Sequence, residues 1–176
     1  MPGSLASLLS FLIVVQDAVS RFTYWLGAAA IGLIVVIFSY EVTARYLFFA
    51  PTYWASDFVS FLLLISVFMV MPWLTREGGH VAVTLLPDTM PPRPAALLLR
   101  AGFLVGAVVC MWVGYISVLE NVNLYQRNVS TLTTVRIPKW TLTALITYAL
   151  FNSGLHFLRL VFTKQLGGGV SRQADV

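Results

Sequence analysis

Carboxylates and histidines are the side chains of this sequence that could perform acid–base or metal chemistry. Six of the seven acidic residues fall outside the long uncharged apolar segments, most of them near a segment edge: Asp17, Glu41, Asp57, Glu77, Asp88 and Glu120. A membrane enzyme or proton pump needs ionisable groups within the bilayer. No two of these carboxylates are spaced to face each other at mid-membrane depth, so the pattern does not predict an acid–base active site.

The remaining reactive residue types are equally dispersed. His80 lies between two apolar segments and His156 lies near the end of the last one, whereas a haem-binding bundle would want axial ligands on facing helices. A single cysteine, Cys110, excludes a disulfide framework and a cysteine-rich metal site. Gly78-Gly79 lacks the flanking residues of a phosphate-binding loop. We therefore expect no enzymatic activity, no cofactor and no metal.

Composition sets the class of protein that must position these residues. The chain has 176 residues, of which 59% are hydrophobic and 10% are charged, whereas soluble domains have about 45–50% apolar and about 25% charged residues. The net charge is +4, but the eleven basic residues form no stripe, which argues against a nucleic-acid partner. The composition is typical of an integral membrane protein.

Four charge-free segments are long enough to span a bilayer, which needs about 20 apolar residues as helix. They are Phe22–Tyr40, Phe58–Leu74, Ala101–Leu119 and Trp140–Leu158. Membrane strands alternate apolar and polar residues, but Ile31–Phe38 and Phe61–Val70 are apolar on every side. The sequence therefore predicts an all-α membrane fold with four transmembrane helices.

The segment before the first span is apolar over Leu5–Val15 but too short to cross a bilayer. A signal peptide is one interpretation, although no basic residue precedes the run. We prefer a short interfacial helix that leads into the first span. The predicted organisation is an N-terminal interfacial segment over 1–21, a four-helix membrane domain over 22–163 and a disordered cytoplasmic tail over 164–176.

Orientation follows from the basic residues near the span ends. The side that holds both termini carries seven of them: Arg21, Arg76, Arg93, Arg100, Arg159, Lys164 and Arg172. The opposite side carries four: Arg45, Arg127, Arg136 and Lys139. The excess predicts that both termini are cytoplasmic.

Small residues form a stripe along the third predicted span, where Gly102, Gly106, Cys110 and Gly114 recur every four positions. Such stripes allow helix backbones to approach closely in lipid. The stripe is expected to pack either against another helix of this chain or against another subunit. Ala28 and Gly32 offer a weaker version in the first span.

Charged residues at the first connection suggest local pairing. Glu41 precedes Arg45 by four positions, the favourable order for a helical ion pair, although the two could simply be solvated at a helix end. Asp57 opens the second span, where a carboxylate suits the helix dipole, or it could pair with Arg45. Trp54 is one of the aromatic residues that mark the span ends.

Polar residues in the last span share one face, because Asn152, His156 and Arg159 are separated by four and three positions. Arg159 can extend to the membrane surface. Asn152 is about 18 Å along the axis from Trp140 at about 1.5 Å per residue, within the hydrocarbon. We therefore expect Asn152 to face protein.

Three motifs surround these spans in a recognisable order. The first is Arg45-Tyr46-x-Phe48-x-x-Pro51-x-x-Trp54-x-x-Asp57, the second is Arg76-Glu77-Gly78-Gly79-His80-Val81-x-Val83, and the third is Ile137-Pro138-Lys139-Trp140. Over residues 20 to 163 the chain resembles the small membrane subunit, of the Q or DctQ type, of tripartite ATP-independent periplasmic (TRAP) transporters. Family members often carry acids where this chain has Ser56 and Thr84.

The resemblance implies a scaffold subunit in a bacterial inner membrane. Its implied partners are membrane lipids, a large membrane subunit (M) that carries substrate and sodium in an elevator movement, and a periplasmic binding protein (P) that captures an organic acid. The matching residues, including Arg76, His80, Pro138 and Trp140, are candidate interface or structural positions. The alternatives are a small membrane redox anchor and a stand-alone dimeric exporter.

Overall fold

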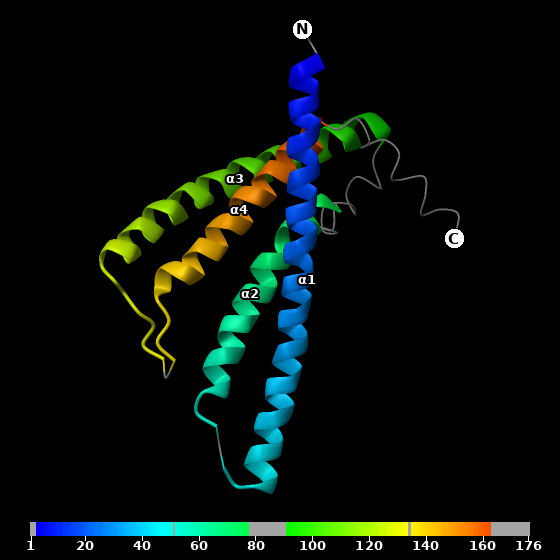
Figure 1. The fold of residues 1–176 in the computed structure, drawn as a ribbon. Coiled ribbons are helices and arrows are strands. Elements are labelled where there is room, and N and C mark those ends of the chain that lie inside the picture. Colours follow the sequence, from blue (N-terminus) through cyan, green and yellow to red (C-terminus); the bar gives the residue numbers. More distant parts are fainter. Residues whose placement is uncertain (1–2, 51, 78–90, 134, 163–176) are drawn as a thin grey trace, which may run out of the picture.

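Four long helices make up the computed structural model, which describes residues 3–50, 52–77, 91–133 and 135–162 (Figure 1). They are α1 (Gly3–Leu47), α2 (Ala55–Arg76), α3 (Pro92–Gln126) and α4 (Lys139–Phe162). Each is long and apolar enough to cross a membrane, so the predicted all-α fold with four spanning helices is confirmed. His80 and the expected tail over 164–176 lie outside the described residues.

The expected separate N-terminal helix is wrong, because α1 runs without a break for 45 residues from Gly3. No glycine or proline occurs between Gly3 and Gly27, so nothing in that stretch stops a helix. Asp17 and Arg21 interrupt the hydropathy but not the backbone. Likewise α3 begins at Pro92, well before the predicted Ala101, with a proline where the first helical turn needs no N–H donor.

The helices pair as two antiparallel hairpins, α1 with α2 and α3 with α4, and α2 joins them by packing on α4. Figure 1 shows the hairpins diverging away from the region where α4 passes α1. The two connections, 48–54 and 127–138, lie at the same end of the molecule, opposite the N-terminus. The hairpin topology therefore places both of these connections at one end of the molecule and the N-terminus at the other.

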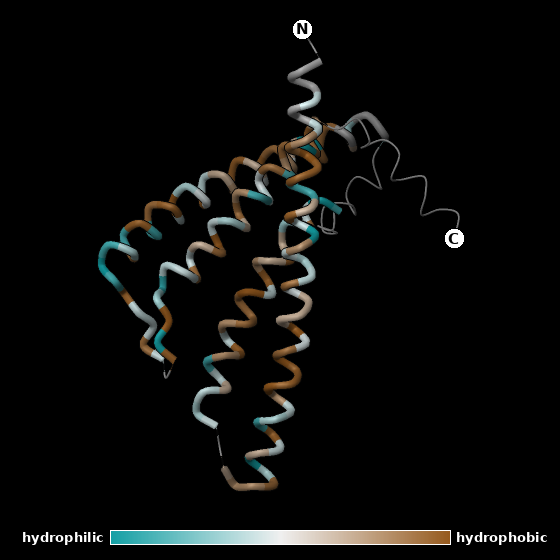
Figure 2. The backbone as a smooth tube through the Cα atoms, in the orientation of Figure 1, coloured by the Kyte–Doolittle hydropathy of each residue, from teal (hydrophilic) through white to brown (hydrophobic). Residues whose placement is uncertain are grey.

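Charged residues bracket each helix at nearly the same separation. The four pairs are Arg21 and Glu41 on α1, Asp57 and Arg76 on α2, Arg100 and Glu120 on α3, and Lys139 and Arg159 on α4. Members of a pair are 19 or 20 positions apart, or about 30 Å at about 1.5 Å per residue, the thickness of a hydrocarbon core. We call the side with Arg21, Arg76, Arg100 and Arg159 the arginine edge, and the other side the loop edge. Figure 2 shows the mainly apolar helices between them.

Small and polar side chains hold α1 close to α2. Ser20, Thr23, Gly27 and Ala30 are buried at spacings of three and four, the pattern of a left-handed helix pair. A Cβ atom on Gly27 would lie 2.6 Å from Val70 Cγ2 and 3.0 Å from the Ser66 carbonyl oxygen. Gly32, which the sequence suggested as a packing residue, has nothing within 4 Å of its Cβ position. Gly27 and Gly32 are five positions apart, or about 140° around the helix, so the contact lies on a different face of α1 from Gly32.

The predicted stripe on α3 packs against α4 within this chain. Cβ atoms on Gly106 and Gly114 would each lie 3.3 Å from a phenylalanine ring, that of Phe157 and of Phe151 respectively. Between them, Cys110 is buried with Ala107 and Phe157 in the core cluster of the hairpin, whereas Gly102 is exposed. Three of the four small residues thus serve the intramolecular interpretation.

Gly27 and Gly32 offer a matched test of the α1–α2 contact. Gly27→Ala is expected to lower the free energy of unfolding by about 1–3 kcal/mol, because the added methyl group overpacks the seam. Gly32→Ala should leave stability unchanged or raise it by up to about 1 kcal/mol through helix propensity. The measurement is thermal or denaturant unfolding in detergent, followed by circular dichroism. Equal effects of the two substitutions would show that the helices are not in contact at Gly27.

Candidate functional site

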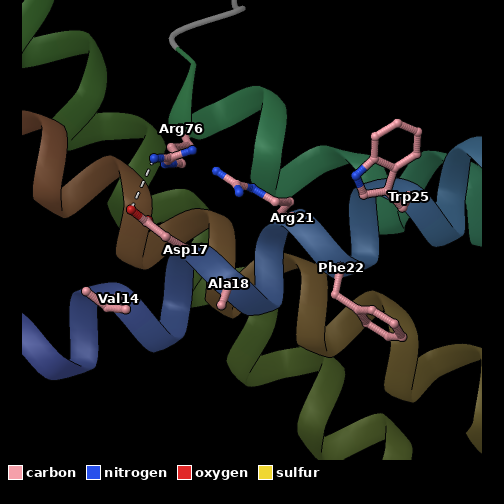
Figure 3. Close-up of a pocket in the computed structure, with 7 residues that line it drawn as sticks. All are labelled: Val14, Asp17, Ala18, Arg21, Phe22, Trp25 and Arg76. Carbon is pink, nitrogen blue, oxygen red and sulfur yellow. Dashed lines mark ion pairs between the residues drawn. The ribbon is translucent and has the colours of Figure 1, made fainter.

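One carboxylate joins three helices at the arginine edge. Asp17 of α1 lies with Oδ1 2.8 Å from Arg159 Nη1 of α4 and with Oδ2 3.2 Å from Arg76 Nη2 of α2. Figure 3 shows the Asp17–Arg76 pair bridging the two helices. The side chains are 21%, 37% and 29% exposed, respectively, so water screens the charges only partly. The shared carboxylate fixes α1 against both α2 and α4.

A group of hydrogen-bonded side chains, Gln16, Ser20, Asn152 and His156, continues from this ion pair into the membrane-spanning part. We call it the polar layer. Asn152 donates through Nδ2 to Ser20 Oγ and to Tyr148 Oη, both at 3.0 Å. Its Oδ1 accepts from Gln16 Nε2 at 3.1 Å. Asn152 is 7% exposed, so the expectation that it faces protein agrees with its position. An amide with partners for both its donor and its acceptor is stable in a low-dielectric interior.

His156 completes the layer through Ser20. Its Nε2 lies 2.9 Å from Ser20 Oγ, and Ser20 Oγ also donates to the Gln16 carbonyl oxygen at 2.9 Å. A hydroxyl group has only one proton, so with that proton on the Gln16 carbonyl, the ring Nε2–H is the donor to Ser20. The histidine is thereby held in one orientation.

The serine–histidine pair has no access to a substrate. Ser20 is 0% exposed and His156 is 1% exposed, and nucleophilic catalysis needs a place beside the hydroxyl for the reacting carbon. Within the described ranges, no three His, Cys, Asp or Glu side chains come together as metal ligands would. What this group can do is join α1 to α4, which it does by hydrogen bonds and one ion pair.

A second tie between the hairpins lies at the loop edge. Asp57 Oδ2 accepts a hydrogen bond from the Val135 backbone N–H at 3.4 Å, which links the first turn of α2 to the α3–α4 connection. That connection is held in shape by Thr131, whose N–H donates to the Ile137 carbonyl at 2.9 Å and whose Oγ1 accepts from the Ile137 N–H at 2.9 Å. Asp57 is therefore a structural residue at a turn, as well as an acid in the first turn of a helix.

The other residues predicted around the first connection stay near it. Arg45 Nη2 lies 2.6 Å from Glu41 Oε1, so the predicted ion pair is formed. Trp54 precedes α2 and stacks on Tyr40 with ring centroids 6.2 Å apart. Both contacts lie at the exposed end of the α1–α2 hairpin, far from the polar layer in the chain.

The Pro138-Trp140 element opens α4. Pro138 forms an isolated antiparallel bridge with Ser130, and Trp140 packs edge-on against Tyr125 with ring centroids 5.7 Å apart. These contacts close the α3–α4 hairpin. The predicted site residues are therefore split. Arg76 lies at the arginine edge and Asn152 in the adjoining polar layer, and both bond to residues of α1. Asp57, Pro138 and Trp140 lie at the loop edge.

The main residues that the sequence did not single out are Gln16, Asp17 and Ser20. They form the polar face of an otherwise apolar stretch, with Gln16 and Ser20 four positions apart. That spacing matches Asn152 and His156 on α4, and it is the signal that could have paired the two faces. The sequence analysis placed Asp17 only among the carboxylates outside the apolar segments, and the structure pairs it with Arg76 and Arg159.

The polar layer gives a test with a neighbouring control. Asn152→Leu should lower stability or subunit association by about 0.5–1.5 kcal/mol, the range for buried polar contacts in membranes, because Gln16 and Ser20 lose their partner. Ser153→Ala should be neutral or stabilising, since Ser153 Oγ is buried and has no hydrogen-bond partner among the described residues. Unfolding in detergent measures both. A stable Asn152→Leu variant would exclude a stabilising role for the layer.

Comparison with known proteins adds one finding. A family model described as "Tripartite ATP-independent periplasmic transporters, DctQ component" matches residues 34–166, which is more than half of the chain and includes α2, α3 and α4. None of the curated proteins matches the chain.

Proposed function

Since the chain belongs to the DctQ component family of tripartite ATP-independent periplasmic transporters, we propose that it is the non-catalytic small subunit of a sodium-coupled transporter for organic acids. Its role is to bind and stabilise a large membrane subunit that moves the substrate. A periplasmic binding protein delivers the substrate to that assembly. The observation that carries this proposal is the charge-free interior of all four helices between the arginine edge and the loop edge.

A carrier for an anion and sodium needs a different interior. Transporters bind such solutes near mid-membrane depth with broken helices, whose ends present backbone dipoles. The ends of α2, α3 and α4 within the described ranges lie outside the charge-free segments, and α1 is continuous. The buried polar groups of the Asn152 layer already bond one another. These features favour a structural subunit over a carrier.

The shape of the chain suits a scaffold. The two hairpins diverge from the region where α4 passes α1 (Figure 1), yet they are tied at one edge by Asp17 and at the other by Asp57. A body that is tied at both edges resists changes in the angle between its hairpins. Joined to a large subunit with a moving part, it would widen the fixed frame against which that part shifts.

Orientation follows from the two edges. Arginine ends all four charge-free segments at the arginine edge, whereas three of the four residues that end them at the loop edge are acidic: Glu41, Asp57 and Glu120. Basic residues favour the cytoplasmic side. We therefore place the arginine edge and both termini in the cytoplasm of a bacterial inner membrane, with the loop edge in the periplasm.

Cysteine labelling in cells tests this orientation. Tyr53→Cys and Leu132→Cys, both highly exposed in the loop-edge connections, should react with a membrane-impermeant thiol reagent added to the periplasmic side. Glu77→Cys, at the end of α2, should react only after the membrane is opened. The native Cys110 is buried and should stay silent. Labelling of Glu77→Cys from outside would reverse the assignment.

Reconstitution tests the scaffold role directly. Liposomes that contain the large subunit and this chain, with a sodium gradient and loaded binding protein outside, should accumulate substrate. Liposomes with this chain alone should not, because no spanning helix carries a charged residue in its middle. Omitting this chain should reduce uptake by the large subunit at least tenfold.

Two outcomes would contradict the proposal in different ways. Uptake by this chain alone would make it a carrier. Full uptake by the large subunit without it would make the scaffold dispensable. A reconstitution with Gly32→Ala, which changes an exposed position on α1, serves as the variant control and should retain uptake.

A further inference from the structure

A groove lies beside the Asp17 ion pairs on the outer side of α1, at the arginine edge (Figure 3). Its volume is about 540 Å³, and its lining residues come from α1 and the end of α2: Val14, Asp17, Ala18, Arg21, Phe22, Trp25 and Arg76. The lining combines two guanidinium groups with a largely apolar and aromatic wall. Asp17 and Arg76 also form the ion pair between α1 and α2, whereas Arg21 and the apolar wall have no part in the polar layer or in that tie.

Arg21 is a cation of the groove for which no anionic partner lies among the described residues. Its guanidinium carbon lies 5.6 Å from the Trp73 ring centroid, and that of Arg76 lies 4.6 Å from the same centroid. Asp17 is already shared between Arg76 and α4, and Glu77 lies 3.5 Å from Arg76. Among the described residues, Arg21 forms no ion pair. Around the groove, three guanidinium groups (Arg21, Arg76 and Arg159) face two carboxylates (Asp17 and Glu77), and this excess of one positive charge favours an anion beside Arg21.

The apolar wall has a direction relative to the membrane. Phe22 and Trp25 follow Arg21 along α1, on the side that leads into the charge-free segment, and they are 70% and 67% exposed. An occupant that satisfied both parts of the groove would have an anionic head at Arg21 and an apolar chain along Phe22 and Trp25. A phospholipid in the cytoplasmic leaflet has this order of groups.

We propose that this groove binds an anionic phospholipid, with the headgroup phosphate on Arg21 and Arg76 and an acyl chain against Phe22 and Trp25. Basic pockets between membrane helices on the cytoplasmic side are suited to such headgroups. The bound lipid places an anion beside Arg21 and covers the aromatic wall. It occupies the outer side of the same turn of α1 whose inner side carries Ser20 and the polar layer.

The experiment is native mass spectrometry of the purified full-length chain with equal amounts of phosphatidylglycerol and phosphatidylcholine. The parent chain should retain more phosphatidylglycerol. Arg21→Gln should reduce that preference roughly fivefold, as expected for one arginine near a membrane surface. Arg100→Gln is the matched control, because Arg100 is an exposed arginine at the same edge but on α3, away from the groove. It should keep the preference within about twofold.

Two further variants and a competition experiment separate lipid binding from a folding defect and from binding of a free phosphate. Arg21→Lys keeps the positive charge and should keep the preference, so loss with both Arg21 variants and an altered circular dichroism melt would identify a folding defect and overturn the site. Trp25→Ala should weaken retention of both lipids without changing their ratio. Soluble glycerol 3-phosphate should not displace the lipid, and displacement at equal concentration would overturn the proposal in favour of a simple phosphate site.

Three other results would also overturn it. An equal loss for Arg21→Gln and Arg100→Gln would show diffuse attraction to the whole edge. An unchanged lipid preference for Arg21→Gln would exclude Arg21 as the headgroup ligand. An unchanged preference together with weaker copurification of the large subunit would assign the groove to an acidic side chain of that partner.

Discussion

The arrangement of the helices depends on the two ion pairs of Asp17, one with Arg76 of α2 and one with Arg159 of α4. Apolar contact alone cannot set the angle between membrane helices, since lipid tails are as apolar as leucine side chains. A carboxylate with one partner on each of two other helices can, because separating either pair takes an ionic partner away from a partly buried charge. Asp17 satisfies Arg76 and Arg159 together, and the hydrogen-bonded layer of Asn152 continues the same join toward the membrane interior.

The two hairpins use a different physical device from the join between them. Within each hairpin, glycines allow the helices to approach closely. Gly27 packs against Val70 of α2, and Gly106 and Gly114 pack against phenylalanine rings of α4. Such contacts gain dispersion energy and lose little side-chain entropy. Between α1 and α4, which pack less closely, long polar side chains span the gap. Close packing therefore holds each hairpin together, and polar side chains hold one hairpin against the other.

The sequence predicts the four spanning helices well because each apolar segment ends at a charge on both sides. It predicts the outer boundaries poorly, since α1 and α3 continue past Arg21 and Arg100, and a charged residue ends an apolar segment without ending a helix. Periodicity correctly placed Asn152, His156 and Arg159 on one face. It could not say that this face meets Gln16, Asp17 and Ser20, because their partners lie more than 130 positions away. Periodicity shows which residues share a helix face, but it does not show which faces pack against each other.

The different surroundings of Gly27 and Gly32 could not be predicted from the sequence for the same reason. Gly27 and Gly32 are indistinguishable by residue type and lie in the same apolar stretch, yet only Gly27 meets α2. The difference comes from the rotation of α1 about its own axis. The contacts of Asp17, Ser20 and Gly27 with the neighbouring helices are all consistent with this one rotation. Sequence reasoning that treats each helix alone has no access to this quantity.

The unbroken length of α1 has a mechanical consequence. At about 1.5 Å per residue, 45 residues make a rod of about 67 Å, and the Asp17 clip holds it about 21 Å from its first turn. The clip therefore acts as a fulcrum between a short arm on one side and the membrane-crossing arm on the other. A tilt of about 10° at the clip would displace the Gly3 end by about 4 Å on this geometry. Any force applied to the short arm is thus transmitted as an angle, not absorbed by a flexible joint.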